Sequence, residues 1–217
     1  MENKTSKKKL FLKIFTHILG AIFIVICGII IYFNLTHEYH IVEGSSMVPT
    51  LNYNGSTDGV FVSKVKSYKR GDIIVTKIGE LNENNSEKIV IKRLIAIGGD
   101  KITIREVDGV NRIVLIYFDE TNEIILEEPY LLDYYQNAGL KTKFQEMITE
   151  QSLELDDDGF LTIAEDEIFF LGDNRVSSRD CLKYGPKKKS MVVGLVDYIA
   201  YGNKYIYWQV IKQVFGG

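Results

Sequence analysis

Residues 89–100 read Ile89-Val90-Ile91-Lys92-Arg93-Leu94-Ile95-Ala96-Ile97-Gly98-Gly99-Asp100, which places a lysine inside an apolar, β-branched run. A run of this kind that ends in a glycine turn predicts a β-strand. Strand alternation puts Lys92 on one face with Leu94 and Ala96, and it puts Arg93 on the other face. Because an ammonium on an apolar face is costly, we expect a lysine there to be neutral or paired. An exposed Lys-Arg pair on a strand edge is the alternative interpretation.

Similar short runs lie on both sides of this strand, bounded by turn residues such as Asn54-Gly55 and Asp108-Gly109. They comprise residues 40–42, 60–63, 72–76, 101–104, 112–117, 168–171 and 191–196. Many short strands with such turns predict a mainly β fold, with antiparallel strands in a barrel- or sandwich-like domain. The acidic stretch 119–158 interrupts the pattern, and we interpret it as an inserted smaller subdomain. Its residues 140–149 fit a short helix or another strand.

The N-terminal part of the chain predicts a membrane anchor. Residues 14–34 are almost wholly apolar, and roughly 20 residues of helix cover the ~30 Å hydrocarbon core of a bilayer. Lysines precede this span, and the next lysine after it is Lys64. The positive-inside rule therefore predicts a basic cytoplasmic N-terminus over 1–13, a transmembrane helix over 14–34 and an extracytoplasmic domain over 35–217. A cleaved secretory signal is less consistent, since its apolar region is usually about 7–15 residues and no A-x-A-like site follows Phe33.

Composition narrows the function classes. The chain has 217 residues, 46% of them hydrophobic, and a net charge of -3, which argues against wholesale disorder and against nucleic acid as a partner. Cys27 lies in the apolar span and Cys181 in the outer domain, so a bond between them is geometrically implausible, and Cys181 is expected to be a small buried residue. No zinc-type spacing is present, so no metal and no cofactor is predicted. The aromatic segment 198–208 suits a membrane interface, or a final strand and helix that pack on the core.

A second run, Glu43-Gly44-Ser45-Ser46-Met47-Val48-Pro49-Thr50-Leu51, holds a glycine-flanked serine soon after the apolar span. A serine hydroxyl is a poor nucleophile until a base removes its proton. His40 lies just before the run, and a triad that uses it is possible in principle. A lysine can serve instead when desolvation lowers its pKa. A third run, residues 172–181, is a polar loop after an apolar strand.

The apolar span and these three runs, in this order, resemble the type I signal peptidases, which are membrane-anchored bacterial serine proteases with a Ser/Lys dyad. The resemblance implies that Ser46 is the nucleophile, that Lys92 is the general base and that the Ser178 hydroxyl orients the lysine amine. The oxyanion would be met by the backbone N–H of Ser46. A variable region, here about 105–166, would be inserted in the catalytic domain. The wall of the active site would be held by Asp173, Asn174, Arg175 and Asp180.

The chain also departs from this family pattern. It has Asp180-Cys181-Leu182 where members usually have D-S-R, so one arginine is missing and one buried ion pair is in doubt. Asp180 is left to pair with Arg93 or Arg175, and the sequence does not choose between them. Gly44 stands where some members add a serine hydroxyl to the oxyanion site. After the lysine, Ala96 stands where the family often has a glycine, which would alter a substrate pocket.

The expected function is removal of signal peptides from secreted preproteins at the outer face of the cytoplasmic membrane, with the bilayer as a second partner. The substrate would lie extended beside Ile41 and Val42, and Gly44, Ser45 and Ala96 would complete the substrate site. Small residues one and three positions before the cut would enter shallow apolar pockets. The alternatives are a specialised protease with narrow substrates, a self-cleaving repressor-like protein, and a catalytically silent membrane-tethered binding module.

Overall fold

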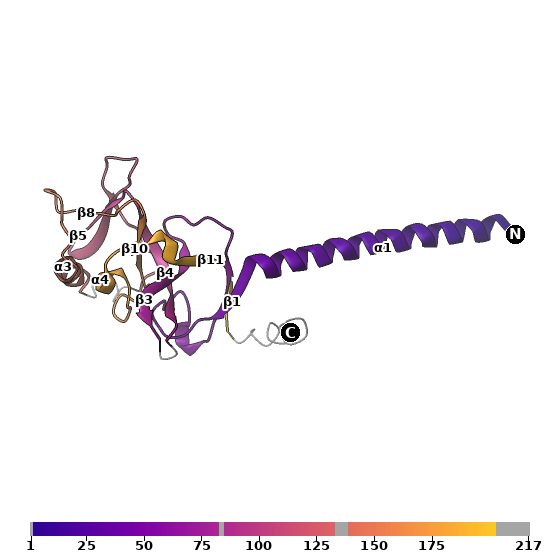
Figure 1. The fold of residues 1–217 in the computed structure, drawn as a ribbon, viewed down its shortest axis with the longest axis horizontal. Coiled ribbons are helices and arrows are strands. Elements are labelled where there is room, and N and C mark those ends of the chain that lie inside the picture. The colour runs from indigo at the N-terminus through magenta and orange to yellow at the C-terminus, as the bar shows by residue number, and fades with distance from the viewer. Residues whose placement is uncertain (1, 83–84, 133–138, 203–217) are drawn as a thin grey trace. The chain divides into compact units, whose positions relative to one another are not determined.

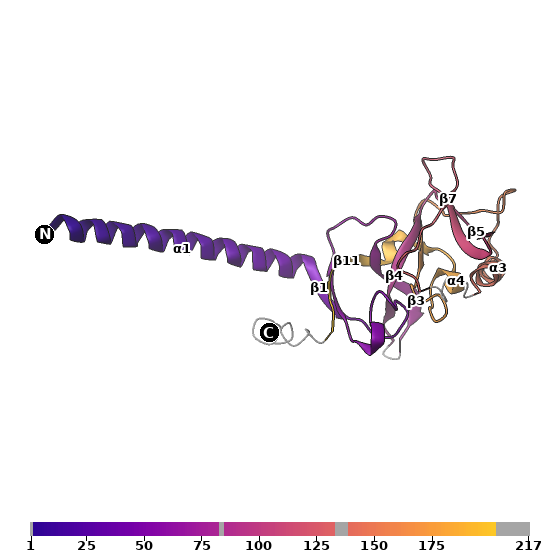
Figure 2. The same ribbon diagram turned by 180° about the vertical axis from the view of Figure 1, so that it is seen from behind.

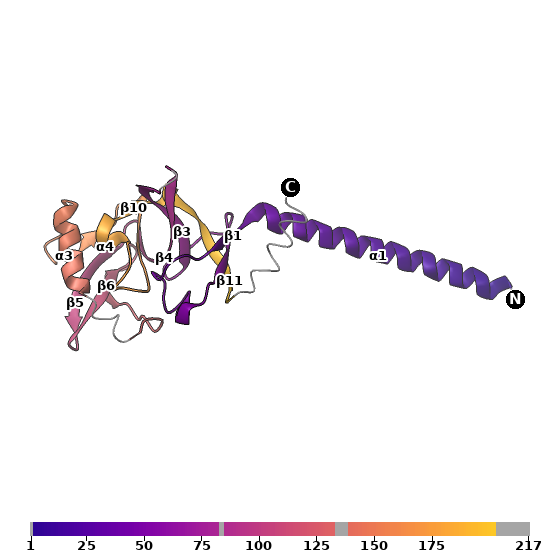
Figure 3. The same ribbon diagram turned by 90° about the horizontal axis from the view of Figure 1, so that it is seen from below.

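The computed structural model describes residues 2–82, 85–132 and 139–202, and it divides into two compact units, Met1–Glu38 and Tyr39–Gly217. The first unit is essentially one continuous helix, α1 (Glu2–Thr36), which Figure 3 shows from the side. Its stretch Lys8–Thr36 contains an 18-residue window with a mean hydropathy of 2.7, and it is long and apolar enough to cross a membrane. The span expected at 14–34 lies inside this helix.

The second unit is built from two antiparallel sheets (Figures 1 and 2). The seven-stranded sheet runs in the order β1 (His37–Ile41), β2 (Gly59–Ser63), β11 (Val192–Ala200), β3 (Ile73–Leu81), β4 (Glu87–Ile97), β9 (Glu167–Leu171) and β10 (Lys187–Lys188). The four-stranded sheet runs in the order β7 (Ile124–Ile125), β6 (Val110–Ile116), β5 (Lys101–Val107) and β8 (Leu161–Thr162). Each order runs from one edge strand to another, so the architecture is sandwich-like and not a closed barrel. The predicted mainly β, antiparallel fold is confirmed.

The strand that carries Lys92 is longer than its central run suggested. β4 pairs with β3 along Glu87–Arg93, with Lys92 opposite Ile74, and it pairs with β9 only from Arg93 onward. The register with β9 shifts between Leu94 and Ala96, which marks a β-bulge. Strict alternation therefore fails in this half of the strand, where Leu94, Ile95 and Ala96 are all buried.

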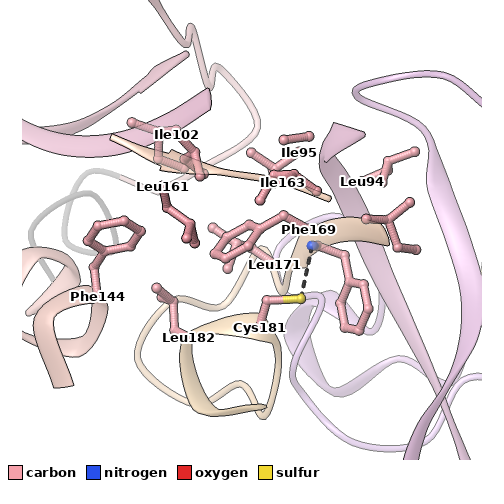
Figure 4. Packing of buried hydrophobic residues seen from close by; sticks show 14 of the residues in the cluster. Leu94, Ile95, Ile102, Phe144, Leu161, Ile163, Phe169, Leu171, Cys181 and Leu182 are labelled. Atoms are coloured by element: carbon pink, nitrogen blue, oxygen red, sulfur yellow. Dashed lines mark hydrogen bonds between the residues drawn. The ribbon is translucent and has the colours of Figure 1, made fainter. Parts of the chain in front are cut away.

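The main hydrophobic core joins both sheets to the short helices. α3 (Leu140–Glu150) buries Leu140, Phe144 and Met147, whose spacing puts them on one helical face. Figure 4 shows Phe144, Leu161, Phe169 and Leu182 converging in this core. Each such side chain stabilises the fold by about 1.5–3 kcal/mol when it leaves water. Residues 140–149, which fitted either element type, thus belong to a helix that fastens the inserted region to the core.

α4 (Cys181–Tyr184) follows the third run and packs on β9. Cys181 is fully buried, and its Sγ accepts a hydrogen bond from the Phe170 N–H at 3.2 Å (Figure 4). Burial raises the pKa of this thiol well above its ordinary value, so it stays protonated and unreactive. The expectation of a small buried cysteine is confirmed. The aromatic segment 198–208 lies mostly outside the described residues, but Tyr198 and Tyr201 are exposed.

Candidate active site

The Lys92 amine, carried by β4, contacts the Ser46 hydroxyl, which lies in the turn segment after β1. Lys92 Nζ lies 2.7 Å from Ser46 Oγ and 2.9 Å from the carbonyl oxygen of Ile91. Lys92 is only 3% exposed. Burial lowers its pKa from 10.5 to about 8, although the negative charges of Asp180 and Asp173 act in the opposite direction. The pair therefore combines hydrogen-bond contact with an amine that titrates close to neutral pH.

The serine segment is held over a small hydrophobic cluster of its own. Met47 and Leu51 are buried in this cluster with Val42, Val60, Val62 and Val75. A short 3-10 turn, η1 (Tyr53–Gly55), follows the segment. Just before that turn Asn52 donates from its amide to the carbonyl oxygens of Val42 at 2.7 Å and Gly44 at 3.0 Å. These contacts fix the path of the chain on both sides of Ser46.

The polar loop 172–180 packs directly on the serine segment. The Asn174 N–H donates to the Ser46 carbonyl at 3.0 Å, and the Asn174 amide donates to the Ser45 carbonyl at 3.0 Å. Gly172 is required for this contact, because a Cβ there would lie 2.2 Å from Ser178 Oγ and 2.5 Å from the Ser46 carbonyl oxygen. Ser178 Oγ is buried and has no hydrogen-bond partner within the described part of the chain.

Two ion pairs also hold the loop 172–180 in place. Arg93 donates to both carboxylate oxygens of Asp173, at 2.9 and 2.6 Å, and Thr50 of the serine segment donates to Asp173 at 2.5 Å. Arg175 is paired with Glu128. Strand alternation predicted that Arg93 and Lys92 point to opposite faces of the strand. The Arg93 guanidinium indeed binds Asp173, whereas the Lys92 amine binds Ser46. Asp173 thereby joins β4, the serine segment and the loop.

The expected pairing of Asp180 with Arg93 or Arg175 is wrong. Asp180 accepts from the backbone N–H groups of Gly172 at 2.9 Å and Leu182 at 3.0 Å, so it caps α4. Both arginines are already satisfied by other carboxylates. The charge of Asp180 is therefore met by these two backbone N–H groups.

A cleft of about 600 Å³ opens at the dyad. It is lined by residues 40–47, Val75, residues 88–92 and residues 176–179. Ile41, Val42, Gly44 and Ser45, which were expected to bind substrate, all line it together with Ser178. Ala96 does not: it is fully buried in the main core beside β9, so its expected role in substrate binding is corrected.

The two long walls of the cleft present main-chain edges. On one wall, the N–H of Val42 donates to the Asp58 carbonyl, and the Asn52 amide donates to the carbonyls of Val42 and Gly44. On the other wall, β4 pairs with β3 along one edge, and pairing with β9 on its other edge starts only at Arg93. A main-chain edge that is not paired within a sheet can take up an extended peptide as an added strand.

Sequence reasoning missed several residues that shape the site. Asn52 has a left-handed backbone conformation. The asparagines just before Gly55 indicated a turn, but they gave no sign that the Asn52 side chain would bind the backbone of residues 42 and 44. Glu128 and Tyr130 come from the inserted region, far from the runs in sequence. A general signal was available for Glu128, because a buried arginine needs a carboxylate partner. In the described ranges, no group of three or more His, Cys, Asp or Glu side chains could hold a metal ion.

Comparison with known proteins gives consistent matches along most of the chain. The family described as signal peptidase, peptidase S26, matches residues 14–201. Signal peptidase I U of Bacillus subtilis is 29% identical over 185 residues, which cover 83% of each chain. Signal peptidase I of Bacillus caldolyticus is 32% identical over 176 residues, 81% of this chain and 86% of its own. A solved signal peptidase I from Enterococcus faecalis is 26% identical, covers 61% of this chain and 98% of its own, and has a TM-score of 0.38.

Proposed function

The chain belongs to the signal peptidase family, peptidase S26, as a type I signal peptidase, and we propose that it cleaves preproteins through a dyad of Ser46 and Lys92. The observation that carries this proposal is the 2.7 Å contact between Lys92 Nζ and Ser46 Oγ, made by an amine that is 3% exposed. The groups around it supply the remaining parts of an acyl-transfer site.

Lys92 acts as the general base. Its pKa of about 8 leaves about a tenth of the amine neutral at pH 7, enough to take the Ser46 proton as the hydroxyl attacks the scissile carbonyl. The Ser46 N–H stabilises the oxyanion. The ammonium returns its proton to the leaving amine, which gives an acyl-enzyme and frees the mature protein. Lys92 then takes a proton from a water molecule that attacks the acyl carbonyl. It returns this proton to Ser46 Oγ as the ester bond breaks and the signal peptide leaves with a new carboxyl terminus.

Ser178 orients the amine for these transfers. Its buried hydroxyl lines the same cleft and has no hydrogen-bond partner among the described residues. A buried polar atom without a partner is costly, so a small rotation of the Lys92 amine or the arrival of substrate is expected to satisfy it. Asp173, Asn174, Arg175 and Asp180 hold the loop that carries Ser178.

The substrate adds as an extended strand between residues 41–44 and 88–91. Alternate side chains of a strand point the same way, so residues one and three positions before the cut face the cleft floor together. That floor includes the apolar Val42, Met47 and Val75. A shallow apolar floor accepts small residues and rejects large ones, which is the specificity expected for signal peptides.

The helix α1 anchors the enzyme in the cytoplasmic membrane, with the basic N-terminus inside and the catalytic unit outside. Its apolar length supports the anchor, and the lysines that precede residue 14 support the orientation. A signal peptide is itself held in the bilayer by its apolar segment. Enzyme and substrate then search for each other in two dimensions, which raises their effective concentration.

The test is cleavage of a purified preprotein by the full chain in detergent, read by mass spectrometry of the new N-terminus. Ser46→Ala removes the nucleophile, and Lys92→Arg replaces the base with a group that stays protonated. Both variants are expected to lose cleavage while Ser67→Ala, an exposed serine outside the cleft, keeps it. Substantial activity in either dyad variant contradicts the mechanism. A panel of preproteins separates a general enzyme from one with narrow substrates.

A further inference from the structure

We propose that Glu128, in the inserted region, is a positioning residue that holds the catalytic loop 172–180 against Ser46. The inference rests on the proposed dyad function and assigns a role to a region that the sequence marks only as a variable insertion. Glu128 touches neither substrate nor the reacting atoms. It acts through Arg175, which it binds, and through Gly172, to whose carbonyl Arg175 donates.

The first step is a buried ion pair. Glu128 is 8% exposed and Arg175 is 3% exposed. Arg175 Nη1 lies 3.1 Å from Glu128 Oε2, and Nη2 donates to Oε1, so the pair is bidentate. The Tyr130 hydroxyl donates to the same Oε1 at 2.7 Å. Loss of one member of such a pair leaves an unpaired buried charge, which is strongly unfavourable.

The second step leads from Arg175 to the dyad. Arg175 Nε donates to the Gly172 carbonyl at 3.0 Å, and the Gly172 N–H donates to Asp180 at 2.9 Å. The peptide groups on both sides of Gly172 are therefore fixed. Gly172 is also the residue on which Ser178 Oγ and the Ser46 carbonyl pack with no room for a methyl group. A displacement of the Arg175 guanidinium moves this contact directly.

Two further contacts from the inserted region reach the same loop and strand. The ring of Tyr130 lies under the Arg93 guanidinium at 3.8 Å, and Arg93 is both the neighbour of Lys92 in β4 and the partner of Asp173. Burial, followed by the charge of Glu128, raises the pKa of the Tyr130 hydroxyl, so it remains a donor. From α3, Lys143 donates to the Arg175 carbonyl at 2.6 Å.

These contacts distinguish positioning from simple stabilisation. The charged groups that act on the Lys92 amine are Asp180, Asp173 and Lys88, and the first two lie in the loop that Glu128 holds. Burial is the largest influence on this amine, and the packed loop helps to exclude water from it. If the loop loosens, water reaches Lys92 and its pKa rises toward the ordinary 10.5.

The experiment compares Glu128→Gln with Glu127→Gln, its exposed neighbour, in the full chain in detergent. Glu128→Gln is expected to lower kcat about tenfold or more, to change KM by less than about twofold, and to move the pH midpoint of kcat/KM upward. Glu127→Gln is expected to match the parent protein in all three. Glu128→Asp, which keeps the charge on a shorter arm, is expected to recover part of kcat.

A merely structural role gives a different result. If Glu128 only stabilises the fold, Glu128→Gln unfolds at a lower temperature, but its folded fraction keeps the kcat of the parent protein and the same pH midpoint of kcat/KM. That outcome overturns the proposal. Should Glu128→Gln fail to fold, Tyr130→Phe keeps the ring under Arg93 and removes only the hydroxyl. Its expected loss in kcat is about fivefold, with the same upward shift of the midpoint, and parent values contradict the proposal. Retained cleavage by Ser46→Ala would instead refute the dyad itself.

Discussion

At the scale of single residues, the proposed mechanism depends on the environment of one amine. Lys92 lies in β4 and is 3% exposed, and burial lowers its pKa to about 8 against the charges of Asp180 and Asp173. The direction of this shift fixes the sign of the pH dependence. A lysine base works only when neutral, so activity is lost as pH falls below the folded pKa and is fully present above it.

The first prediction is therefore a single-limb pH profile. Below pH 8, kcat/KM for a synthetic preprotein peptide should fall about tenfold per pH unit, and above pH 9 it should level off, because deprotonation of Lys92 is then complete. Initial rates between pH 6 and 10 check this. Since the charge of Asp180 raises the pKa of Lys92, Asp180→Asn should move the midpoint to lower pH. A flat profile between pH 6 and 8 would exclude Lys92 as the base.

The sequence allowed Ser46 and Lys92, which the fold brings into contact, to be singled out, but it did not reveal the residues that support them. Ser46 and Lys92 stand out because each is a reactive side chain in an unusual local setting. Asn52 and Glu128 are ordinary polar residues whose importance arises only from contacts with distant parts of the chain. Local patterns carry no information on such contacts. The wrong pairing for Asp180 has the same origin, because several carboxylates and arginines were available and only the fold chooses among them.

At the scale of elements, the site depends on how closely the loop 172–180 approaches the serine segment. β9 ends at Leu171, and the next residue, Gly172, turns the chain beneath Ser46 and Ser178. Any Cβ at this position meets both a side chain and a backbone carbonyl. A side chain can rotate away, but the Ser46 carbonyl is held by the Asn174 N–H.

The second prediction follows from this contact. Gly172→Ala is expected to destabilise the outer unit by about 1–3 kcal/mol through overpacking, and to lower kcat by about 100-fold because Ser46 is displaced. Addition of Ser178→Ala should not restore activity, since the overlap with the Ser46 carbonyl remains. Gly28→Ala, an open position in α1, serves as the control. Urea unfolding and preprotein cleavage measure the two effects, and parent-like kcat in Gly172→Ala would contradict the argument.

Strand existence was easier to predict than strand length or regularity. Runs of β-branched residues located β2, β3, β4, β5, β6, β9 and β11, because such residues suit a pleated, half-buried surface. The bulge after Leu94 was not predictable, since it depends on pairing with β9. Leu94, before the shift, and Ala96, after it, both lie in the main core, and neither lines the cleft.

At the scale of the whole molecule, the chain combines an apolar helix with a compact β unit that contains all parts of the candidate site. The inserted region between β6 and β9 was predicted by its acidic composition and its departure from strand patterning. The contribution of this region to the site was not predicted. Glu128 and Lys143 contact Arg175, and Tyr130 contacts Arg93, only because the folded chain brings these distant residues together. The inserted region therefore contributes contacts to the candidate site.

The last prediction concerns the orientation of this molecule in the membrane. Lysines crowd the residues before 14, and moving them across an apolar core costs several kcal/mol, so the N-terminus should stay in the cytoplasm. In intact spheroplasts that express the full chain with an N-terminal epitope, external protease should digest the unit Tyr39–Gly217 and leave the epitope with α1. Inverted vesicles should give the opposite pattern, and a cytoplasmic marker protein controls for leakage. Digestion of the β unit only after the membrane is opened would place it inside the cell, away from emerging preproteins, and would exclude the proposed function.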